Sequence, residues 1–399
     1  MARRTLARSL AAPILAAATL GVLSLAAAPA QAASTGSGAL PPGTGSLGQC
    51  GAGSHGGTLV PTGATANTRF TQAFRDFGNS GGGWADQGGW AASDGVYSTT
   101  VPGKGVVWLM NDTFLGPVNA DESMTQPGFI HGSAVLGGRD GLPDTTVTGG
   151  THDAPESLVS PPGSTGDPWY WNSDGIVDGG KLLVFEGRTG STDGPPPWNF
   201  GWLGTDIATL STKDFHVEKV TPTYGTPAGT GIGWGNELMR CGSQIYVYGQ
   251  KSGVMYVARA RAGHLAEMSW QFFDGTGWSA DEAAAAPIGD DVGASYSVTP
   301  MDGQFVLTTT ATGIFTDHRI YVATSSSPTG PFVNRTAVYT APEGVGHIYA
   351  PYNVAAHPDI SRPGELVVSY NVNSQVGDDL LADANNNRPR FVTVTFGRG

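Results

Sequence analysis

The chain has 399 residues, of which 60 are Gly and 27 are Pro, and only 14% are charged. Its formal net charge at pH 7 is −12, and an acidic chain repels phosphate backbones, so nucleic acid is not an expected partner. Many glycines and prolines with few charges favour short strands and tight turns over a helical protein. The chain is also long enough to bury a core of its own.

Residues 1–32 predict a secretory signal peptide. Three arginines within the first eight residues precede an apolar stretch that ends in the small-residue motif Ala-Gln-Ala at 30–32. Cleavage there would remove three cations and leave 367 residues (399 minus 32) with a net charge of −15 (−12 minus 3). We therefore expect a secreted, extracellular protein that has no membrane contact after cleavage.

Residues 33–66 are rich in Gly, Ser, Thr and Pro, and we expect a leader rather than a domain. The folded domain is expected to span residues 67–399. Cys50, in the leader, and Cys241 are the only cysteines. In an exported protein they either form one disulfide or remain two separate buried thiols, and the sequence leaves both alternatives open.

A repeat governs the rest of the chain. Ser-Asp-Gly, a hydrophobic run, a Gly turn and a second strand occur at 93–112 and again at 173–188. Strong hydrophobic strands begin at residues 105, 181, 244, 304 and 365, so successive starts are 76, 63, 60 and 61 residues apart. A turn and another short strand precede each of them. Five such units predict an all-β fold, a five-bladed β-propeller with long inter-blade loops at 113–168 and 189–204.

Helical periodicity is almost absent from the chain. Only residues 281–287 look helix-like, and Pro287 ends that stretch quickly. Residues 68–74 and 388–396 are strand-like segments at opposite ends of the domain. Because a propeller seals its ring by pairing strands from its two ends, we expect these two segments to lie in one blade.

In a propeller the first strand of each blade lines the channel, so the residues that open these strands meet at one mouth. The repeat places Asp94 and Asp174 at related positions, and the third unit adds Glu237. Aromatic rings pack on the C–H faces of sugars, while hydroxyl groups need anionic or amide acceptors. The side chains expected at the mouth for this purpose are Trp90, Trp171, Trp234, Asn236, Tyr296, His347 and Tyr352.

Two carboxyl groups that flank a glycosidic bond are the usual equipment for its hydrolysis. We expect Asp94 to be the nucleophile or the base that activates water, and Glu237 to be the general acid. Asp174 is expected to hold the orientation and to raise the pKa of the acid by like-charge proximity. The structural alternatives are a turn-forming role for each Asp before Gly and an exposed edge position for Glu237.

Other chemistries have little support in the sequence. It contains no H-E-x-x-H motif and no phosphate-binding loop. We expect no metal site and no required cofactor, although a structural cation in the channel is compatible with the sequence. We expect a monomer whose partner is a polysaccharide.

Several motifs also resemble a known group of proteins. "SDGVYS", "MNDTFLGPVN", "FIHGSAVL" and "RPRFVTV" are similar to motifs of secreted actinobacterial proteins grouped as domains of unknown function. That group in turn resembles the endo-D-arabinanase family of glycoside hydrolases. The resemblance implies a five-bladed propeller with an Asp, an Asp and a Glu in its first three blades, which Asp94, Asp174 and Glu237 match. The group motifs also mark Asp112 and His131 as reserve candidates.

The sequence therefore predicts a secreted glycoside hydrolase that acts on a furanose-containing polysaccharide, with cell-wall D-arabinan as the substrate that the resemblance suggests. The alternative is a non-catalytic carbohydrate-binding propeller, which would use the same aromatic rim but would need no paired acids. A surface interaction module is a third hypothesis, because propellers also serve as scaffolds.

Overall fold

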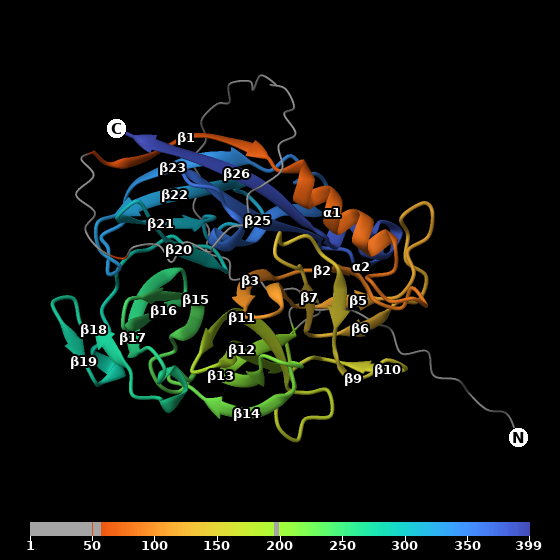
Figure 1. Cartoon of the computed structure of the whole chain (residues 1–399), viewed down its shortest axis with the longest axis horizontal. Helices are drawn as coiled ribbons and strands as arrows, with labels where there is room; N and C mark the ends of the chain where they lie inside the picture. Colours follow the sequence, from red (N-terminus) through yellow and green to blue (C-terminus); the bar gives the residue numbers. More distant parts are fainter. Residues whose placement is uncertain (1–49, 51–56, 195–198) are drawn as a thin grey trace, which may run out of the picture.

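The computed structural model describes residue 50, residues 57–194 and residues 199–399. The predicted signal peptide and most of the predicted leader lie outside the described residues. The described chain is built mainly from antiparallel sheets, with few short helices (Figure 1). The all-β prediction is confirmed.

Five antiparallel sheets follow one another along the chain. Sheet one contains β3 (Val96–Val101), β4 (Gly105–Met110), β7 (Ser133–Leu136) and β8 (Thr145–Val147). Sheet two contains β11 (Trp169–Asp178), β12 (Lys181–Ser191), β13 (Phe200–Ser211) and β14 (Val217–Pro222). Sheet three contains β15 (Gly233–Cys241), β16 (Gln244–Lys251), β17 (Val254–Arg261), β18 (Gln271–Phe273) and β19 (Trp278–Ser279).

The last two sheets complete the set. Sheet four contains β20 (Tyr296–Met301), β21 (Gln304–Thr309), β22 (Arg319–Ser325) and β23 (Val333–Thr340). Sheet five has the strand order β1 (Leu59–Ala66), β26 (Pro389–Arg398), β25 (Glu365–Ser374) and β24 (Ile348–Ala356). Smaller pieces are the sheet of β2 (Trp90–Ser93), β5 (Thr113–Leu115) and β6 (Gly128–Ile130), and the hairpin of β9 (Gly149–Thr151) and β10 (Ala154–Glu156).

One strand from each sheet faces the middle of the molecule. β3 contacts β11, β11 contacts β15, β15 contacts β20, β20 contacts β24, and β24 contacts β3 again. We call these five the first strands. Their cyclic order of contacts surrounds a common centre, and Figure 1 shows the sheets fanning out from it.

The spaces between neighbouring sheets are filled by apolar side chains. Between sheets one and two the cluster includes Leu109, Leu182, Val184 and Leu210, all fully buried. Between sheets four and five a second cluster contains Val306, Val322, Leu366 and Val392. Because strands bury both faces in this way, their sequences read as continuous hydrophobic runs, and this is the signal that the repeat carried.

The long segment 113–168 is not only a loop. It contributes β7 and β8 to sheet one, together with β5, β6, β9 and β10. The helix-like residues 281–287 form only the short 3-10 helix η2 (Glu282–Ala284), whose first turn is capped when Asp281 accepts a hydrogen bond from the Ala283 N–H at 3.0 Å. The other short helices are η1 (Leu265–Glu267), η3 (Pro358–Ile360), α2 (Gly377–Ala382) and η4 (Ala384–Asn387).

The two ends of the domain meet in sheet five, but not through the expected pair of segments. The last strand, β26, pairs antiparallel with β1, from Leu59 opposite Arg398 to Ala66 opposite Val392. The prediction of a strand at 388–396 is confirmed. Its partner is residues 59–66, which composition assigned to the leader, so the folded domain includes them.

Residues 68–74 were expected to form a strand, and this expectation was wrong. They belong to the helix α1 (Thr68–Asn79), because Phe70, Phe74 and Phe77 follow the spacing of one helix face and are all buried. Phe74 stacks on Phe391 of β26, with ring centroids 5.4 Å apart. The side chain of Asn67 caps the helix by accepting a hydrogen bond from the Phe70 N–H at 3.2 Å.

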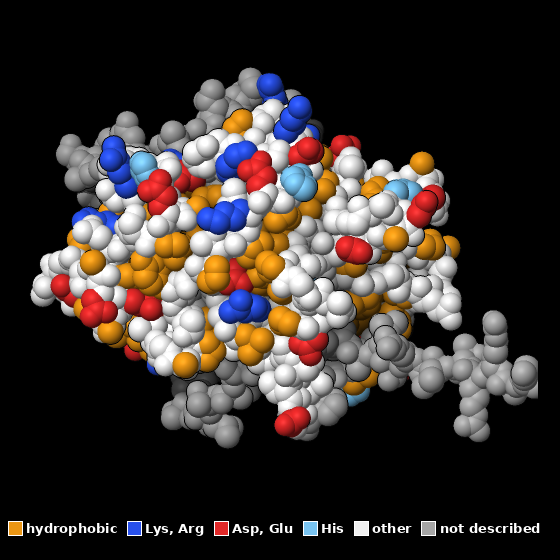
Figure 2. All heavy atoms as spheres, turned by 90° about the horizontal axis from the view of Figure 1, so that it is seen from below, with side chains coloured by type: hydrophobic (Ala, Val, Ile, Leu, Met, Phe, Trp, Pro, Cys, Tyr) orange, Lys and Arg blue, Asp and Glu red, His pale blue; other side chains and the backbone are white. Residues whose placement is uncertain are grey.

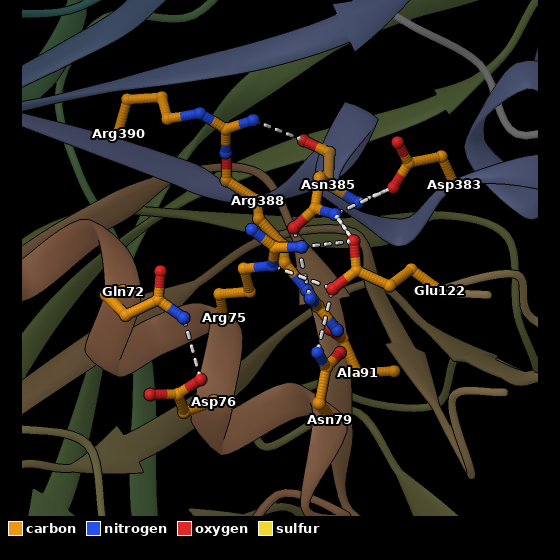
Figure 3. Close-up of polar contacts among 10 residues, drawn as sticks. All are labelled: Gln72, Arg75, Asp76, Asn79, Ala91, Glu122, Asp383, Asn385, Arg388 and Arg390. Carbon is orange, nitrogen blue, oxygen red and sulfur yellow. Dashed lines mark hydrogen bonds and ion pairs between the residues drawn. The ribbon is translucent and has the colours of Figure 1, made fainter. Parts of the chain in front are cut away.

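A polar network connects the other side of α1 to the segment just before β26 (Figure 3). The carboxylate of Glu122 accepts two hydrogen bonds from Arg75, at 2.7 and 2.9 Å, and one from Asn79 at 2.9 Å. Asn385 of η4 donates to the same carboxylate. The buried Arg388 donates to the Ala91 carbonyl at 2.8 Å. One carboxylate thus connects α1 to the segment that leads into β26.

The two cysteines lie next to each other as thiols. Cys241 Sγ is 3.8 Å from the Cys50 carbonyl oxygen, and Cys50 Sγ is 3.6 Å from that of Arg240. Desolvation and the neighbouring Cys241 raise the pKa of Cys50 to about 12. The structure thus shows two neighbouring free thiols, and a disulfide between them in the oxidised protein stays a prediction.

Deleting residues 388–399 is expected to lower the melting temperature sharply. The deletion removes β26 with its buried Phe391, Val392 and Val394, and it leaves β1 without a partner. Differential scanning calorimetry measures the effect. Deleting Gly399 alone, which lies outside β26, is the control. An unchanged transition in the longer deletion would show that pairing of the chain ends does not stabilise the fold.

Glu122 should make the stability depend on pH. Its bonds to Arg75 lower the pKa of Glu122 to about 2, below the ordinary value of 4.5. Because the folded-state pKa is lowered, the stabilisation is present above pH 4.5 and is lost as the pH falls toward 2. Glu122→Gln should therefore lower the free energy of unfolding by about 1 kcal/mol at pH 7 and by much less at pH 2.

Urea titrations at the two pH values measure this difference. Asp76→Asn is the matched control, because Asp76 is exposed on α1, the helix that carries Arg75, and its side chain accepts a hydrogen bond from Gln72. Equal destabilisation by Glu122→Gln at both pH values would contradict an ionic role for Glu122.

Candidate active site

The structure places the three predicted catalytic residues at two different heights along the first strands. Asp94 lies seven residues before the end of β3 (101 minus 94), whereas Asp174 lies four before the end of β11 (178 minus 174). Glu237 lies four before the end of β15 (241 minus 237). A strand rises about 3.3 Å per residue, so Asp94 is roughly 10 Å closer to the strand starts than the other two. The repeat alignment of Asp94 with Asp174 was therefore three residues out of register.

Asp174 and Glu237 form an inner pair that connects neighbouring sheets. Asp174 accepts hydrogen bonds from the Gly175 N–H and from the Leu238 N–H of β15, both at 2.7 Å. Glu237 lies near the side chain of Ser297 and the backbone of Val298 on β20, and both favour its ionised form. Asp174 thus binds the backbone of the next first strand, and Glu237 faces β20.

Both members of the inner pair face a cavity of about 1070 Å³ at the end where the first strands finish. Desolvation raises the pKa of Asp174 to about 7. Desolvation and then the charge of Asp174 raise the pKa of Glu237 well above its ordinary value. Asp94 does not line this cavity. The inner pair is therefore a separate group from Asp94.

Asp112, a reserve candidate, lies beside Asp94 instead. It lies two residues after the end of β4, and its side chain is buried between sheets one and two. Its Oδ1 accepts a hydrogen bond from Trp171 Nε1 at 2.7 Å, and His131 Nδ1 lies 2.8 Å from the same oxygen. The side-chain oxygen of Asp112 is thus held between the Trp171 and His131 rings.

Asp94 is desolvated and lies next to the carboxyl group of Asp112. Desolvation and then the negative charge of Asp112 raise the pKa of Asp94 to about 8, although Tyr352 donates a hydrogen bond to Asp94 Oδ2 at 2.8 Å. Asp94 is therefore protonated at neutral pH. A carboxyl group that stays protonated beside a second carboxyl group is a candidate general acid. In this environment Asp94 suits the acid role rather than the expected nucleophile or base.

Aromatic rings form a wall beside Asp112. His131 stacks on Trp169 with centroids 4.7 Å apart, and Trp169 contacts Trp171 edge to face at 5.8 Å. Trp171 in turn contacts Phe200 of β13 at 5.2 Å. Trp171 and Phe200 remain partly exposed. Exposed ring faces next to carboxyl groups are suited to bind a sugar.

Three of the expected rim aromatics are instead part of the core. Trp90 packs against Phe77 beneath α1, and Trp234 packs against Phe272 within sheet three. Tyr296 donates its hydroxyl to the Gly249 carbonyl at 2.8 Å. All three are at most 1% exposed, so they cannot contact a substrate. The expectation was wrong because their apolar rings are buried between elements and do not face the mouth.

The remaining predicted rim residues have different positions. Trp171 belongs to the aromatic wall, and the buried Tyr352 reaches Asp94 rather than solvent. Asn236 donates to the Ala294 carbonyl at 3.3 Å. His347 is exposed, with Nδ1 3.6 Å from Asp379 Oδ2.

The sequence contained signals for the residues that were missed or held in reserve. The polar pair Asn111-Asp112 ends an otherwise apolar strand, which marks it as a candidate for a site at a strand end. The aromatic run at 169–171 carries two of the rings of the wall. Nothing local to Phe200 indicated that it would lie beside them.

Within residues 50, 57–194 and 199–399, no three His, Cys, Asp or Glu side chains are grouped to hold a metal ion. In the same part of the chain, no helix is long and apolar enough to cross a membrane. On the face shown in Figure 2, acidic and basic side chains are scattered among hydrophobic ones and do not gather by sign.

Comparisons with solved structures show what the fold is similar to. A candidate hydrolase from Bacteroides ovatus has a TM-score of 0.67 at 20% identity, with 84% of this chain and 93% of that chain covered. The similarity is one of fold. An α-L-arabinofuranosidase from Podospora anserina, in complex with cellotriose, has a TM-score of 0.44 at 10% identity, with 79% and 94% covered. A GH43_1 enzyme from Xanthomonas citri, complexed with xylotriose, has a TM-score of 0.42 at 15% identity, with 76% and 87% covered. These last two are too distant to support an argument.

Among curated proteins, no sequence matches this chain. Residues 84–396, which include both carboxyl pairs and the aromatic wall, match the family model described as Domain of unknown function (DUF5005), and the chain belongs to that family.

Proposed function

We propose that this protein is a secreted glycoside hydrolase that acts on a furanose-containing polysaccharide, with Asp94 as general acid and Asp112 as the carboxylate. The observation that carries the proposal is the neighbouring pair itself. One carboxyl group is protonated at neutral pH, the other is held by N–H donors, and a partly exposed aromatic wall lies beside them. Secretion rests on the signal-like sequence of residues 1–32.

The proposed fold is a five-bladed β-propeller, in which each of the five sheets is one blade. The cyclic contacts of the first strands support it, as does the pairing of β1 with β26 in one sheet. In this fold Asp94 and Asp112 lie at the mouth where the first strands begin.

The chemistry needs one proton donor and one carboxylate on opposite sides of the scissile bond. Asp94 gives its proton to the departing glycosidic oxygen as the bond from that oxygen to the anomeric carbon breaks. Asp112 either attacks the anomeric carbon or removes a proton from the water that does so. Trp171 and His131 fix the orientation of the Asp112 carboxyl group. The aromatic wall would pack against the C–H face of a sugar ring.

The roles of the inner pair follow from their bonds. Asp174 and Glu237, expected to be catalytic, would instead stabilise the propeller by connecting blades two, three and four. The substrate class rests on the motif resemblance, and D-arabinan is the first polysaccharide to test. Binding of polysaccharide without release of fragments would favour the non-catalytic carbohydrate-binding alternative.

Asp94→Asn and Asp112→Asn are each expected to reduce kcat by about 10²- to 10⁴-fold with little change in melting temperature, because each removes one half of the acid and carboxylate pair. Chromatography of oligosaccharides released from a panel of furanose and pyranose polysaccharides measures activity. Asp121→Asn is the control, since Asp121 is exposed and its side chain accepts hydrogen bonds from the neighbouring Ser123. Near wild-type turnover by Asp94→Asn on a cleaved substrate would overturn the assignment.

Asp174→Asn tests whether the inner pair has a structural role, in contrast to the catalytic role proposed for Asp94. It weakens the bond to the Leu238 N–H, so we expect a lower melting temperature and a smaller loss of kcat than at Asp94. A loss of kcat as large as that of Asp94→Asn, in a protein of unchanged melting temperature, would return catalysis to the inner pair.

The proposed acid also predicts the pH profile. Because Asp94 acts in its protonated form, activity should fall as the pH rises through about 8. Asp112→Asn removes the negative charge that raises the pKa of Asp94, so the alkaline limb of the residual activity should move to lower pH. An alkaline limb that stays in place in this variant would contradict coupling between the two residues.

A further inference from the structure

A chain of two buried hydrogen bonds reaches Asp94 from sheet five. Tyr352 of β24 donates its hydroxyl to Asp94 Oδ2 at 2.8 Å. Asn373 of β25 donates from Nδ2 to the Tyr352 hydroxyl oxygen at 2.7 Å. Tyr352 is 4% exposed and Asn373 is 3% exposed, so neither can be a surface contact for a polysaccharide.

The direction of every bond in this chain is determined by its donors and acceptors. Asn373 Oδ1 accepts the Ser374 N–H at 2.7 Å, so the amide nitrogen must be the group that faces Tyr352. An amide NH₂ group can only donate, and the tyrosine oxygen therefore accepts. The single hydroxyl proton of Tyr352 is then left to point at Asp94.

This direction has a consequence for the acid. A carboxylic acid accepts hydrogen bonds better at its carbonyl oxygen than at its hydroxyl oxygen, and Tyr352 always presents a proton to Oδ2. The transferable proton of Asp94 is therefore directed to Oδ1. The same hydrogen bond stabilises the carboxylate that remains after transfer.

We propose that Asn373 is a positioning residue that acts through Tyr352 on Asp94, holding the tyrosine proton on Oδ2 so that Oδ1 carries the proton that is transferred. This inference rests on the proposed function for the meaning of that transfer. The orientation of the bonds does not depend on it.

Other groups face Asp94 and must be kept constant in a test. The charge of Asp112, just after β4, raises the pKa of Asp94. The charge of Asp94 in turn raises the pKa of Tyr97 on β3 and of Tyr349 on β24. None of these side chains is changed in the variants below.

Two variants remove the Tyr352 hydroxyl proton that points at Asp94 Oδ2, each in a different way. Tyr352→Phe deletes the hydroxyl and keeps the ring. Asn373→Asp keeps the shape but replaces the donor with an acceptor, so the Tyr352 proton turns toward residue 373 and away from Asp94. Asn371→Asp is the matched control. Asn371 lies on β25, as Asn373 does, and stands opposite Tyr352 of β24. It is as buried as Asn373 and makes no hydrogen bond to Tyr352. The control variant adds the same charge at a comparable position.

The direct measurement is the titration of Asp94, followed by NMR of protein labelled with ¹³C at the Asp carboxyl carbon and assigned with Asp94→Asn. Loss of the Tyr352 bond removes stabilisation of the carboxylate, so the pKa of Asp94 should rise. We expect a shift on the order of tenfold in the ionisation equilibrium for Tyr352→Phe. Asn373→Asp should shift it at least as much, and clearly more than Asn371→Asp.

In a turnover assay, Tyr352→Phe and Asn373→Asp should lower kcat by roughly tenfold with KM little changed, and the alkaline limb should move to higher pH. The titration is independent of any substrate. If Asp94 titrates identically in Asn373→Asp and Asn371→Asp, or does not shift in Tyr352→Phe, the positioning role is wrong even in an active enzyme. If the titration shifts as expected but no polysaccharide is cleaved, the positioning role stands and the proposed function fails.

Far-ultraviolet circular dichroism and the melting temperature show whether each variant folds. Should Asn373→Asp be unfolded, Asn373→Leu replaces it. This variant removes the donor without adding charge, leaves the Tyr352 proton free to turn, and should raise the pKa of Asp94 by a smaller amount than Tyr352→Phe. An unshifted titration in this variant would also overturn the proposal.

Discussion

Pairing of the two ends of the domain is the constraint on which the rest of the structure depends. β26 lies between β25 and β1, so the last strand of the chain is buried inside a sheet that the beginning of the chain completes. Without it, β25 would lose its neighbour on one side, and β25 in turn pairs with β24, the strand that carries Tyr352 to Asp94. The network around Glu122 and the phenylalanines of α1 stabilise the same junction. The positions of the residues at the mouth therefore depend on a contact between residues more than 300 positions apart.

Desolvated carboxyl groups serve two different purposes in the centre of the molecule. Asp174 accepts a hydrogen bond from the Leu238 N–H of the next first strand, so its burial is repaid by a bond that connects two sheets. Asp94 accepts a hydrogen bond from the Tyr352 hydroxyl, and Asp112 accepts one from Trp171 Nε1. A raised pKa alone does not distinguish the two pairs. Their different heights along the first strands and the partly exposed aromatic wall beside Asp112 do.

Part of the candidate site could be predicted from sequence, and the errors have identifiable causes. The Ser-Asp-Gly motif marked Asp94 correctly as a residue at the start of a first strand. The same motif misplaced Asp174, because β3 continues six residues beyond the glycine (101 minus 95) and β11 only three (178 minus 175). Tryptophans near these positions were expected at the rim, but ring size and apolarity equally favour the core, where Trp90 and Trp234 lie.

The sequence by itself determined the all-β class, the five hydrophobic hairpins and the strand at 388–396, because strand period and turn residues are local properties of the chain. It also contained the helix of α1, in the spacing of its phenylalanines. Only the tertiary structure decided that β1 closes sheet five, that Asp112 rather than Asp174 lies beside Asp94, and that Asn373 reaches Asp94 through Tyr352. These are contacts between distant segments, and their geometry depends on strand register and on the hand of the packing between sheets, which no short stretch of sequence specifies.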